Sequence, residues 1–159
     1  MSNKLDLGSG RQSMECPYHT HLDKWAGDHI EYVWDLNNGL PKNDAGFPVF
    51  DSSLDEIRAH HVLEHIHNLY LLMDECWLAL KPTGVMKISV PNGYHLMAAY
   101  SDPTHVRTFV PETFNYFTED TLKNFPYSNR FWEIIEGPTV NGESSNDKWE
   151  IYCALRPVK

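Results

Sequence analysis

Four residues into the chain, a short apolar segment runs directly into a glycine-rich turn. Lys4–Leu7 has the composition of a strand, and Gly8, Ser9 and Gly10 follow it at once. Because glycine has no side chain, such a turn can bend tightly and let the backbone approach a bound ligand closely. A strand that ends in this way predicts an α/β domain with a ligand site at the strand ends.

Two further segments end on an acidic residue. His19–Leu22 is expected to be a strand that ends at Asp23, and Ile30–Trp34 one that ends at Asp35. The carboxyl ends of parallel strands in an open sheet form the crevice where ligands bind. We therefore expect the glycine turn and both carboxylates to meet at one edge of the sheet.

The middle of the chain predicts a loop, a strand, a helix and another strand. Residues 38–53 contain glycines and prolines and predict a long loop, and residues 56–60 predict the next strand. Apolar residues at helical spacing then predict a helix that Pro82 and Gly84 stop. These apolar positions are Leu69, Leu72, Met73, Cys76 and Leu80. A strand over residues 85–90 follows, and Pro91–Gly93 turns the chain.

The last third predicts two short helical pieces and two strands. The helical pieces lie within residues 111–125, and alternating apolar residues predict strands at 131–136 and 149–155. Parallel neighbours need a crossover, which does not fit into the polar connection between these two strands. We therefore expect the last strand to lie antiparallel to the one before it.

Composition limits the function classes that remain. The chain has 159 residues with 42% hydrophobic residues, which predicts a single domain over residues 1–159. With 13 Lys and Arg against 22 Asp and Glu, the formal net charge is −9, and we expect no nucleic-acid partner. The sequence contains no apolar run long enough for a membrane span and no secretory signal, so we expect a cytoplasmic protein without a membrane partner. Cys16, Cys76 and Cys153 are far apart and predict reduced thiols.

Five short motifs, in order along the chain, resemble class I S-adenosylmethionine-dependent methyltransferases, of the small kind described as methyltransferase-domain type 11. The motifs are Asp6–Gly10, Asp23, Asp35, Val62–Ile66 and Leu80–Gly84. The resemblance implies a Rossmann-like α/β fold with a mostly parallel central sheet, an antiparallel C-terminal strand and reduced helix content. It also implies S-adenosylmethionine as the cofactor.

The resemblance assigns a part of the cofactor to each of these positions. Gly8, Ser9 and Gly10 would pass against the methionine and ribose portion, and Asp23 would accept hydrogen bonds from both ribose hydroxyls. Asp35 would lie beside the adenine and Leu36 against its ring. Ala59 and His60 would line the methionine arm. Gln12 replaces the usual third glycine, and a full first helix does not fit before the second strand.

Candidate residues for the methyl acceptor follow the fifth expected strand. The segments 102–107 and 109–114 resemble a histidine- and arginine-containing stretch of small methyltransferases. His105 is the first candidate general base and His61 the second. Arg107 is expected to hold an anionic group or to pair with Glu112, and Tyr94 to line an aromatic pocket. The limited surface of residues 38–53 and 93–111 favours a small-molecule or glycan acceptor.

Two other functions stay open at the level of the sequence. His61–His65 spells HxxEH, which on a helix would place two imidazoles on one face, as in inverted zincin hydrolases. The same letters fit the methyltransferase motif without a metal, and we expect no metal site. The shortened region after Gly10 is also compatible with a degenerate module that binds the cofactor without turnover. A homo-oligomer is one option for the assembly.

Overall fold

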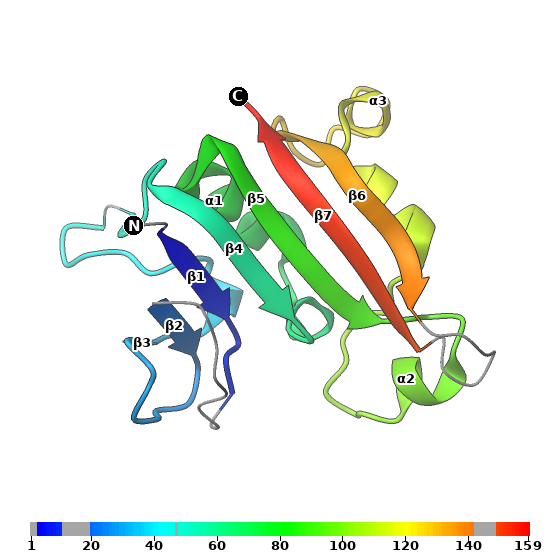
Figure 1. Ribbon diagram of the computed structural model, residues 1–159, viewed down its shortest axis with the longest axis horizontal. Helices are drawn as coiled ribbons and strands as arrows, with labels where there is room; N and C mark the ends of the chain where they lie inside the picture. Colours follow the sequence, from blue (N-terminus) through cyan, green and yellow to red (C-terminus); the bar gives the residue numbers. More distant parts are fainter. Residues whose placement is uncertain (1–2, 11–19, 47, 142–148) are drawn as a thin grey trace.

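The computed structural model describes residues 3–10, 20–46, 48–141 and 149–159. Its strands form one seven-stranded sheet in the order β3-β2-β1-β4-β5-β7-β6 (Figure 1). The strands are β1 (Lys4–Leu7), β2 (Thr20–Asp23), β3 (Tyr32–Val33), β4 (Leu54–His60), β5 (Leu80–Pro91), β6 (Phe131–Asn141) and β7 (Glu150–Val158). The helices are η1 (Leu36–Asn38), η2 (Leu63–His65), α1 (Leu69–Ala79), α2 (Leu96–Tyr100), η3 (Pro111–Phe117) and α3 (Glu119–Leu122), where η marks a 3₁₀ helix.

The directions of the strands confirm the predicted fold class. Strands β3, β2, β1, β4 and β5 pair in parallel, whereas β7 is antiparallel to both β5 and β6. The last strand therefore runs against its predecessor as expected, and it lies between β5 and β6. The strand expected at 19–22 corresponds to β2, which the structure describes from Thr20 to Asp23. His19 lies outside the described residues.

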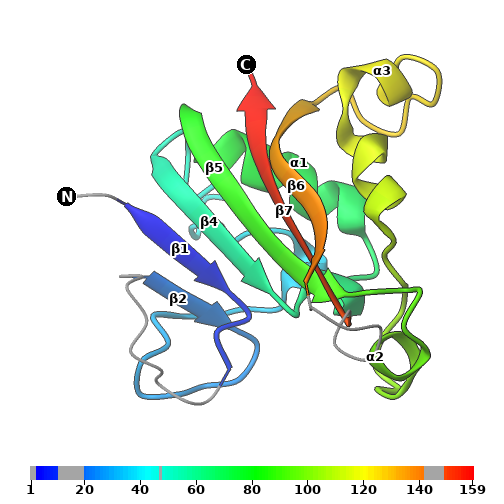
Figure 2. The same ribbon diagram turned by 45° about the vertical axis from the view of Figure 1, so that its right-hand side comes forward.

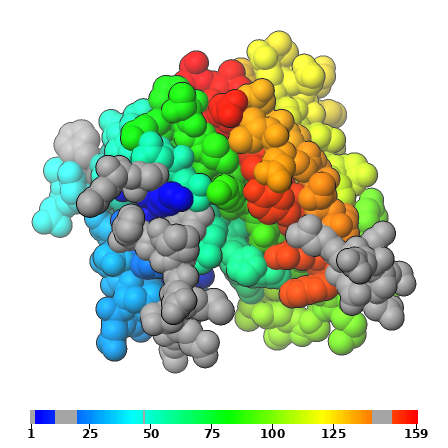
Figure 3. Space-filling model, viewed as in Figure 1, coloured from blue at the N-terminus to red at the C-terminus, as the bar shows by residue number. Residues whose placement is uncertain are grey.

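The sheet is covered by helices on one face. Within the described residues, α1 and the helical turns η3 and α3 pack on the same side of the sheet (Figure 2). Side chains of β5, β7 and β6 form the opposite surface directly (Figure 3). In β5, Met86, Ile88 and Val90 are buried, while Lys87 and Ser89 between them are partly exposed. This alternation is expected of a sheet that has one face packed against helices and the other exposed to solvent. We call the solvent-exposed face the wet face.

Ion pairs stabilise the wet face. Arg58 on β4 donates two hydrogen bonds to Asp6 on β1, from Nε to Oδ1 at 2.6 Å and from Nη2 to Oδ2 at 2.7 Å. Lys87 lies 2.9 Å from Glu56. Asp6 is 1% exposed, and a buried carboxylate needs such partners to remain ionised at low cost.

The helix after β4 differs from its prediction at its C-terminal end. α1 ends at Ala79, and Leu80 already begins β5, so Pro82 and Gly84 lie inside an irregular strand and do not stop the helix. The register between β4 and β5 shifts between Leu54 and Glu56, which accommodates the extra residues. The helical pieces expected within 111–125 are present as η3 and α3.

The cysteines fit the expectation of reduced thiols where they are described. Cys76 and Cys153 are free and buried. Burial raises the pKa of the Cys76 thiol and raises the pKa of Cys153 to about 12. Cys16 lies outside the described residues. The described part of the chain contains no helix with the length and apolar composition of a membrane span.

Candidate functional site

A hollow of about 250 Å³ lies at the carboxyl ends of β1 to β4; we call it the β1–β4 hollow. This volume lies just below that of typical small-molecule sites, which span about 300–1,000 Å³. The hollow lies where ligands bind in open parallel sheets. Its lining residues are Gly8, Asp23, Lys24, Trp25, Trp34, Asp35, Leu36, Asn37, His61, Val62, His65, Ile66 and Thr104.

Gly8 forms part of this hollow for two steric reasons. Its φ is +64°, in the left-handed region that glycine adopts without strain. A Cβ at this position would also lie 2.8 Å from Cγ2 of Val62, which packs against the turn. The amide of Gly8 donates to the carbonyl of Leu22 at 2.8 Å. The turn is thus held between the end of β2 and the segment after β4.

Asp23 connects the turn to the end of β2. The carboxylate is 8% exposed, and it accepts hydrogen bonds from two backbone amides, Gly10 N at 2.9 Å and Trp25 N at 2.8 Å. An ionised carboxylate offers about four lone-pair positions. Two positions therefore remain for hydroxyl groups of a ligand.

Asp35 and Leu36 lie side by side on the same hollow. Asp35 is the N-cap of η1 and accepts from the amide of Asn37 at 2.9 Å. This backbone hydrogen bond lowers the pKa of Asp35, and desolvation opposes the shift in part. Leu36 is buried and presents an apolar wall, and the exposed ring of Trp25 lines the same hollow. An acidic group next to apolar and aromatic surface is suited to a ligand with one polar and one planar part.

A second hollow of about 380 Å³ adjoins the first; we call it the α2 hollow. His61 and His65 line both hollows, so they form the border between them. The wall comes from the end of β4, η2, α2, residues 101–105 and the start of β7. Its lining residues are His61, Glu64, His65, Pro91, His95, Met97, Ala98, Ser101, Asp102, His105 and Trp149.

A buried carboxylate lies at the wall of the α2 hollow. Glu64 is 1% exposed, and its Oε1 lies 3.5 Å from His61 Nδ1, 4.0 Å from His65 Nε2 and 4.0 Å from His105 Nε2. Within the described residues, neither oxygen of this carboxylate accepts a hydrogen bond. Three imidazoles therefore surround one buried, negatively charged group.

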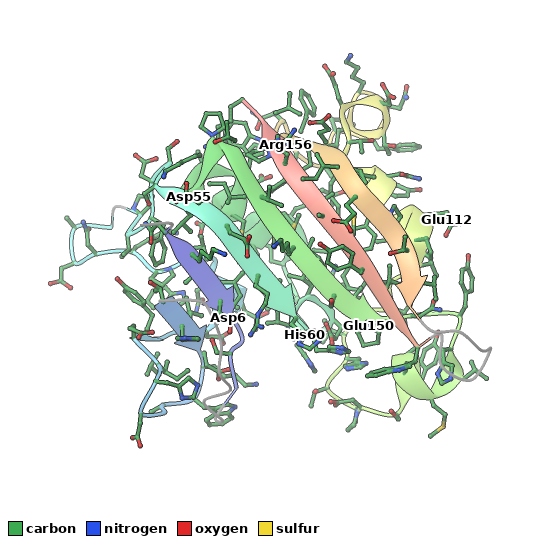
Figure 4. All side chains as sticks on the ribbon, viewed as in Figure 1. Asp6, Asp55, His60, Glu112, Glu150 and Arg156 are labelled. Carbon is green, nitrogen blue, oxygen red and sulfur yellow. The ribbon has the colours of Figure 1, made fainter. Side chains whose placement is uncertain are left out.

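His61 lies between two carboxylates, those of Glu64 and Glu150. Its interaction with Glu64 raises the pKa of His61, burial opposes this, and the carboxylate of Glu150, 3.0 Å from His61 Nε2, raises it further. The residue has a φ of +51°, a left-handed conformation that is unusual for histidine. His60 on the preceding position reaches the same Glu150 oxygen at 3.2 Å (Figure 4).

The helical HxxEH arrangement considered from the sequence is not formed. β4 ends at His60, His61 is left-handed, and only Leu63–His65 form a short 3₁₀ turn. The two histidines therefore do not occupy successive turns of one α-helix. The alternative of an inverted zincin motif is therefore not supported, because β4 extends to His60, the residue before the motif.

The structure separates four predicted cofactor residues from the β1–β4 hollow. Ser9 Oγ donates back to the carbonyl of Asp6 at 3.1 Å, and Gly10 contributes its amide to Asp23. Ala59 and His60 line a different hollow, on the wet face of the sheet. Ala59 is fully buried and the next residue, His60, is exposed, so their side chains point to opposite faces of β4.

The two predicted substrate-binding residues do not line the α2 hollow. Nη2 of Arg107 donates to the carbonyls of Ile66 and His67 at 2.6 and 2.7 Å, and desolvation lowers its pKa. It therefore holds two loops together and does not pair with Glu112. Tyr94 is 70% exposed, and its hydroxyl donates to Glu112 at 3.4 Å.

Sequence reasoning missed most of the α2 hollow. Glu64 and His65 belong to the motif at 62–66, and Asp102 and His105 to the motif at 102–107, but their meeting was not predicted. The signal was the presence of histidine and acid in both motifs. Trp149 comes from a segment more than 80 residues away from Glu64 along the chain, and no local pattern indicates that contact.

No protein-family model and no curated protein matches this chain. Solved structures do match it. The plantazolicin methyltransferase BpumL, in complex with a triazolic analogue and S-adenosylhomocysteine, has a TM-score of 0.66 at 14% identity, over 99% of this chain and 77% of that one. The chain has the fold of S-adenosylmethionine-dependent methyltransferases. At this identity the likeness shows the fold and no more.

Two further structures have the same methyltransferase fold. An S-adenosylmethionine-dependent methyltransferase from Mesorhizobium loti has a TM-score of 0.63 at 15% identity, with 97% of this chain and 90% of that chain covered. The 1,6-didemethyltoxoflavin-N1-methyltransferase from Burkholderia thailandensis, with its acceptor and S-adenosylhomocysteine bound, has a TM-score of 0.59 at 13% identity, with 99% and 72% covered. These matches confirm the fold that the ordered motifs predicted.

Proposed function

We propose that this protein is a methyltransferase that binds S-adenosylmethionine in the β1–β4 hollow and a small acceptor in the α2 hollow. The observation that carries the proposal is the convergence of Gly8, Asp23, Asp35 and Leu36 on one hollow at the carboxyl ends of parallel strands. The resemblance to class I methyltransferases assigns each of these residues to the cofactor. Their meeting in a methyltransferase fold supports that assignment.

The residues of the β1–β4 hollow suit the chemistry of the cofactor. Asp23 keeps two free lone-pair positions for the ribose hydroxyls, because its backbone partners use the other two. Leu36 and Trp25 offer apolar and aromatic surface for the adenine, with Asp35 at the edge of the ring. When bound, the cofactor supplies an electrophilic methyl group on a sulfonium, which is a good leaving group.

The α2 hollow is the proposed acceptor site because it shares a wall with the β1–β4 hollow. His61 lines both hollows, whereas His105 lines the α2 hollow and not the β1–β4 hollow. Of the two histidines predicted to act on the acceptor, His61 is therefore better located to orient it next to the donor. Holding two reactants in line can supply much of the rate of such a transfer.

A small molecule or glycan in the cytoplasm remains the proposed acceptor class. The α2 hollow has a volume of about 380 Å³, which suits a small acceptor group. The methyltransferase from Burkholderia thailandensis, whose structure contains bound 1,6-didemethyltoxoflavin, has the same fold. The net charge of −9 argues against a polyanionic nucleic acid.

The donor half of the proposal is tested by calorimetric titration with S-adenosylhomocysteine. We expect one molecule to bind per chain and Asp23→Asn to weaken binding about tenfold or more, since a charge-assisted hydrogen bond is lost. Asp55→Asn is the matched control, because Asp55 lies near the amino end of β4, at the opposite end of the strands from the β1–β4 hollow. Equal affinities of the two variants for S-adenosylhomocysteine would show that Asp23 does not bind this ligand.

The transfer half is tested with a labelled methyl donor and a panel of small hydroxyl, amine and sugar acceptors. We expect product with at least one acceptor class and slower transfer in His61→Ala. Binding of S-adenosylhomocysteine without transfer to any acceptor would instead identify a binding module without turnover. Full transfer activity in His61→Ala would show that this histidine does not orient the acceptor.

A further inference from the structure

The buried carboxylate of Glu64 accepts no hydrogen bond within the described chain, although it is almost fully removed from solvent. Its nearest nitrogen is Nδ1 of His61, at 3.5 Å, and the other ring nitrogen of His61 contacts Glu150. A buried charge without hydrogen bonds is costly, and proteins normally pair such a group or use it to bind a metal ion. The nitrogens nearest to it belong to histidines, which are also metal ligands. The arrangement of those nitrogens therefore decides which of the two explanations applies.

The two ring nitrogens of His105 have different partners: Nδ1 contacts the backbone of Ala99, and Nε2 faces Glu64. Nδ1 of His105 lies 3.0 Å from the carbonyl oxygen of Ala99, so this nitrogen carries the hydrogen and donates it. In the neutral ring, Nε2 then keeps its lone pair. Nε2 is also the nitrogen that lies 4.0 Å from Glu64 Oε1.

His65 has the same arrangement through a different partner. The hydroxyl of Thr104 donates to Asp102 at 2.7 Å, so its oxygen is available as an acceptor for His65 Nδ1 at 3.0 Å. The carbonyl of Thr104 lies 3.2 Å from the same nitrogen. Nδ1 of His65 is thus a donor, and its Nε2 faces Glu64 with a free lone pair.

We propose that Glu64, His65 and His105 bind a divalent transition-metal ion, with Zn²⁺ as the representative case. Metal-binding histidines usually donate their second ring N–H to a carbonyl or a similar acceptor, as both histidines do here. Two histidines and one carboxylate with open positions are a known ligand set for Zn²⁺ and for Fe²⁺. The three ligand atoms lie within 4.8 Å of one another.

The spacing requires a small contraction when the ion binds. Ligands at about 2.1 Å from a tetrahedral ion lie about 3.4 Å apart, whereas both Nε2 atoms lie 4.0 Å from Glu64 Oε1. The two carboxylate–imidazole pairs must therefore each close by about 0.6 Å, and the two imidazole nitrogens, which lie within 4.8 Å of each other, by at most about 1.4 Å. Rotations of the side chains provide such shifts. His105 would then coordinate the ion, and this replaces the role of general base predicted for it.

The metal site does not depend on the proposed methyltransferase function. Its residues line the α2 hollow, so any open coordination position would face whatever that hollow binds. A second group of possible ligands, His60, His61 and Glu150, lies nearby. There Glu150 already contacts both ring nitrogens at 3.0 and 3.2 Å, and His60 is exposed, so this group lacks the buried carboxylate without a donor.

The test is a titration of tag-free, chelator-treated protein with Zn²⁺ and with Co²⁺, by calorimetry and by the visible absorption of bound Co²⁺. We expect one tightly bound ion per chain. Glu64→Gln and His105→Ala should each weaken binding about tenfold or more, while His60→Ala should leave the affinity unchanged. Circular dichroism of each variant checks that the fold is retained.

A readout on the unmodified protein does not depend on the variants. On addition of Zn²⁺, nitrogen-detected histidine NMR should show a shift of Nε2 in His65 and His105, with Nδ1 still protonated in both. Absence of stoichiometric binding, or an affinity that Glu64→Gln does not change, would overturn the proposal. So would a loss of binding in His60→Ala, because the ion would then lie on the other group. A protein that binds S-adenosylhomocysteine but shows no stoichiometric binding of Zn²⁺ or Co²⁺ would refute the metal site alone and leave the proposed function intact.

Discussion

Substitution of Gly8 by alanine tests whether the turn after β1 has the left-handed, closely packed geometry of the structure. A non-glycine residue at the observed φ of +64° costs about 1–2 kcal/mol. The added Cβ would lie 2.8 Å from Cγ2 of Val62, and forcing an extra group into a packed site costs a further 1–3 kcal/mol or so. We therefore expect Gly8→Ala to lower the free energy of unfolding by about 2–5 kcal/mol.

Gly10→Ala is the matched control for this change. Gly10 has a φ of +73°, but a Cβ there would meet no atom of the described residues within 4 Å, so we expect only the conformational cost of about 1–2 kcal/mol. Urea denaturation gives both values, and the corresponding loss of melting temperature is roughly 10 °C for Gly8→Ala and 4 °C for Gly10→Ala. Equal costs in the two variants would refute the steric contact with Val62.

A double variant isolates the contact itself. Val62→Ala alone should cost about 2 kcal/mol, because it removes two buried methyl groups. Combined with Gly8→Ala, it also removes Cγ2, the atom nearest to the new Cβ. The double variant should therefore cost about 1–2 kcal/mol less than the sum of the single ones. Strict additivity would contradict the geometry of the turn.

Two further predictions concern carboxylates. Asp35→Ala should destabilise the protein by about 1 kcal/mol through loss of the η1 cap, with Asp35→Asn close to wild type. The amide of Asn37 lowers the pKa of Asp35. The stabilisation from this carboxylate is therefore complete above the unfolded pKa of about 3.9 and is lost as the pH falls through the folded pKa. Urea denaturation between pH 3 and 7 should show a larger loss of stability at low pH in wild type than in Asp35→Asn. Arg58→Met removes the two hydrogen bonds to buried Asp6 and should cost about 3 kcal/mol at pH 7; a change below 1 kcal/mol or so in thermal denaturation would contradict this role.

The sequence was sufficient for features that depend on local pattern. The glycine turn, the acids at the ends of β2 and β3 and the antiparallel last strand follow from residue order and strand direction. Their meeting at one edge follows in turn from the parallel arrangement. The wet face of the sheet could also have been predicted, since Lys87 and Ser89 alternate with buried residues in β5.

Features that depend on side-chain direction or distant contacts were not predictable in this way. Ala59 and His60 lie at a strand end, as the resemblance required, but they line the hollow on the wet face and not the β1–β4 hollow. α2 is only five residues long and carries little periodic signal. The cluster around Glu64 needs His105 and the start of β7, which only the folded chain brings together.

The central claim is that the β1–β4 hollow binds the adenosyl part of the cofactor. A crystal structure of the complex with S-adenosylhomocysteine tests it most directly. We expect the ribose hydroxyls within hydrogen-bond distance of the Asp23 carboxylate and the adenine against Leu36. Density for the ligand in another hollow, or a β1–β4 hollow closed by the protein's own side chains at saturating ligand, would contradict the claim.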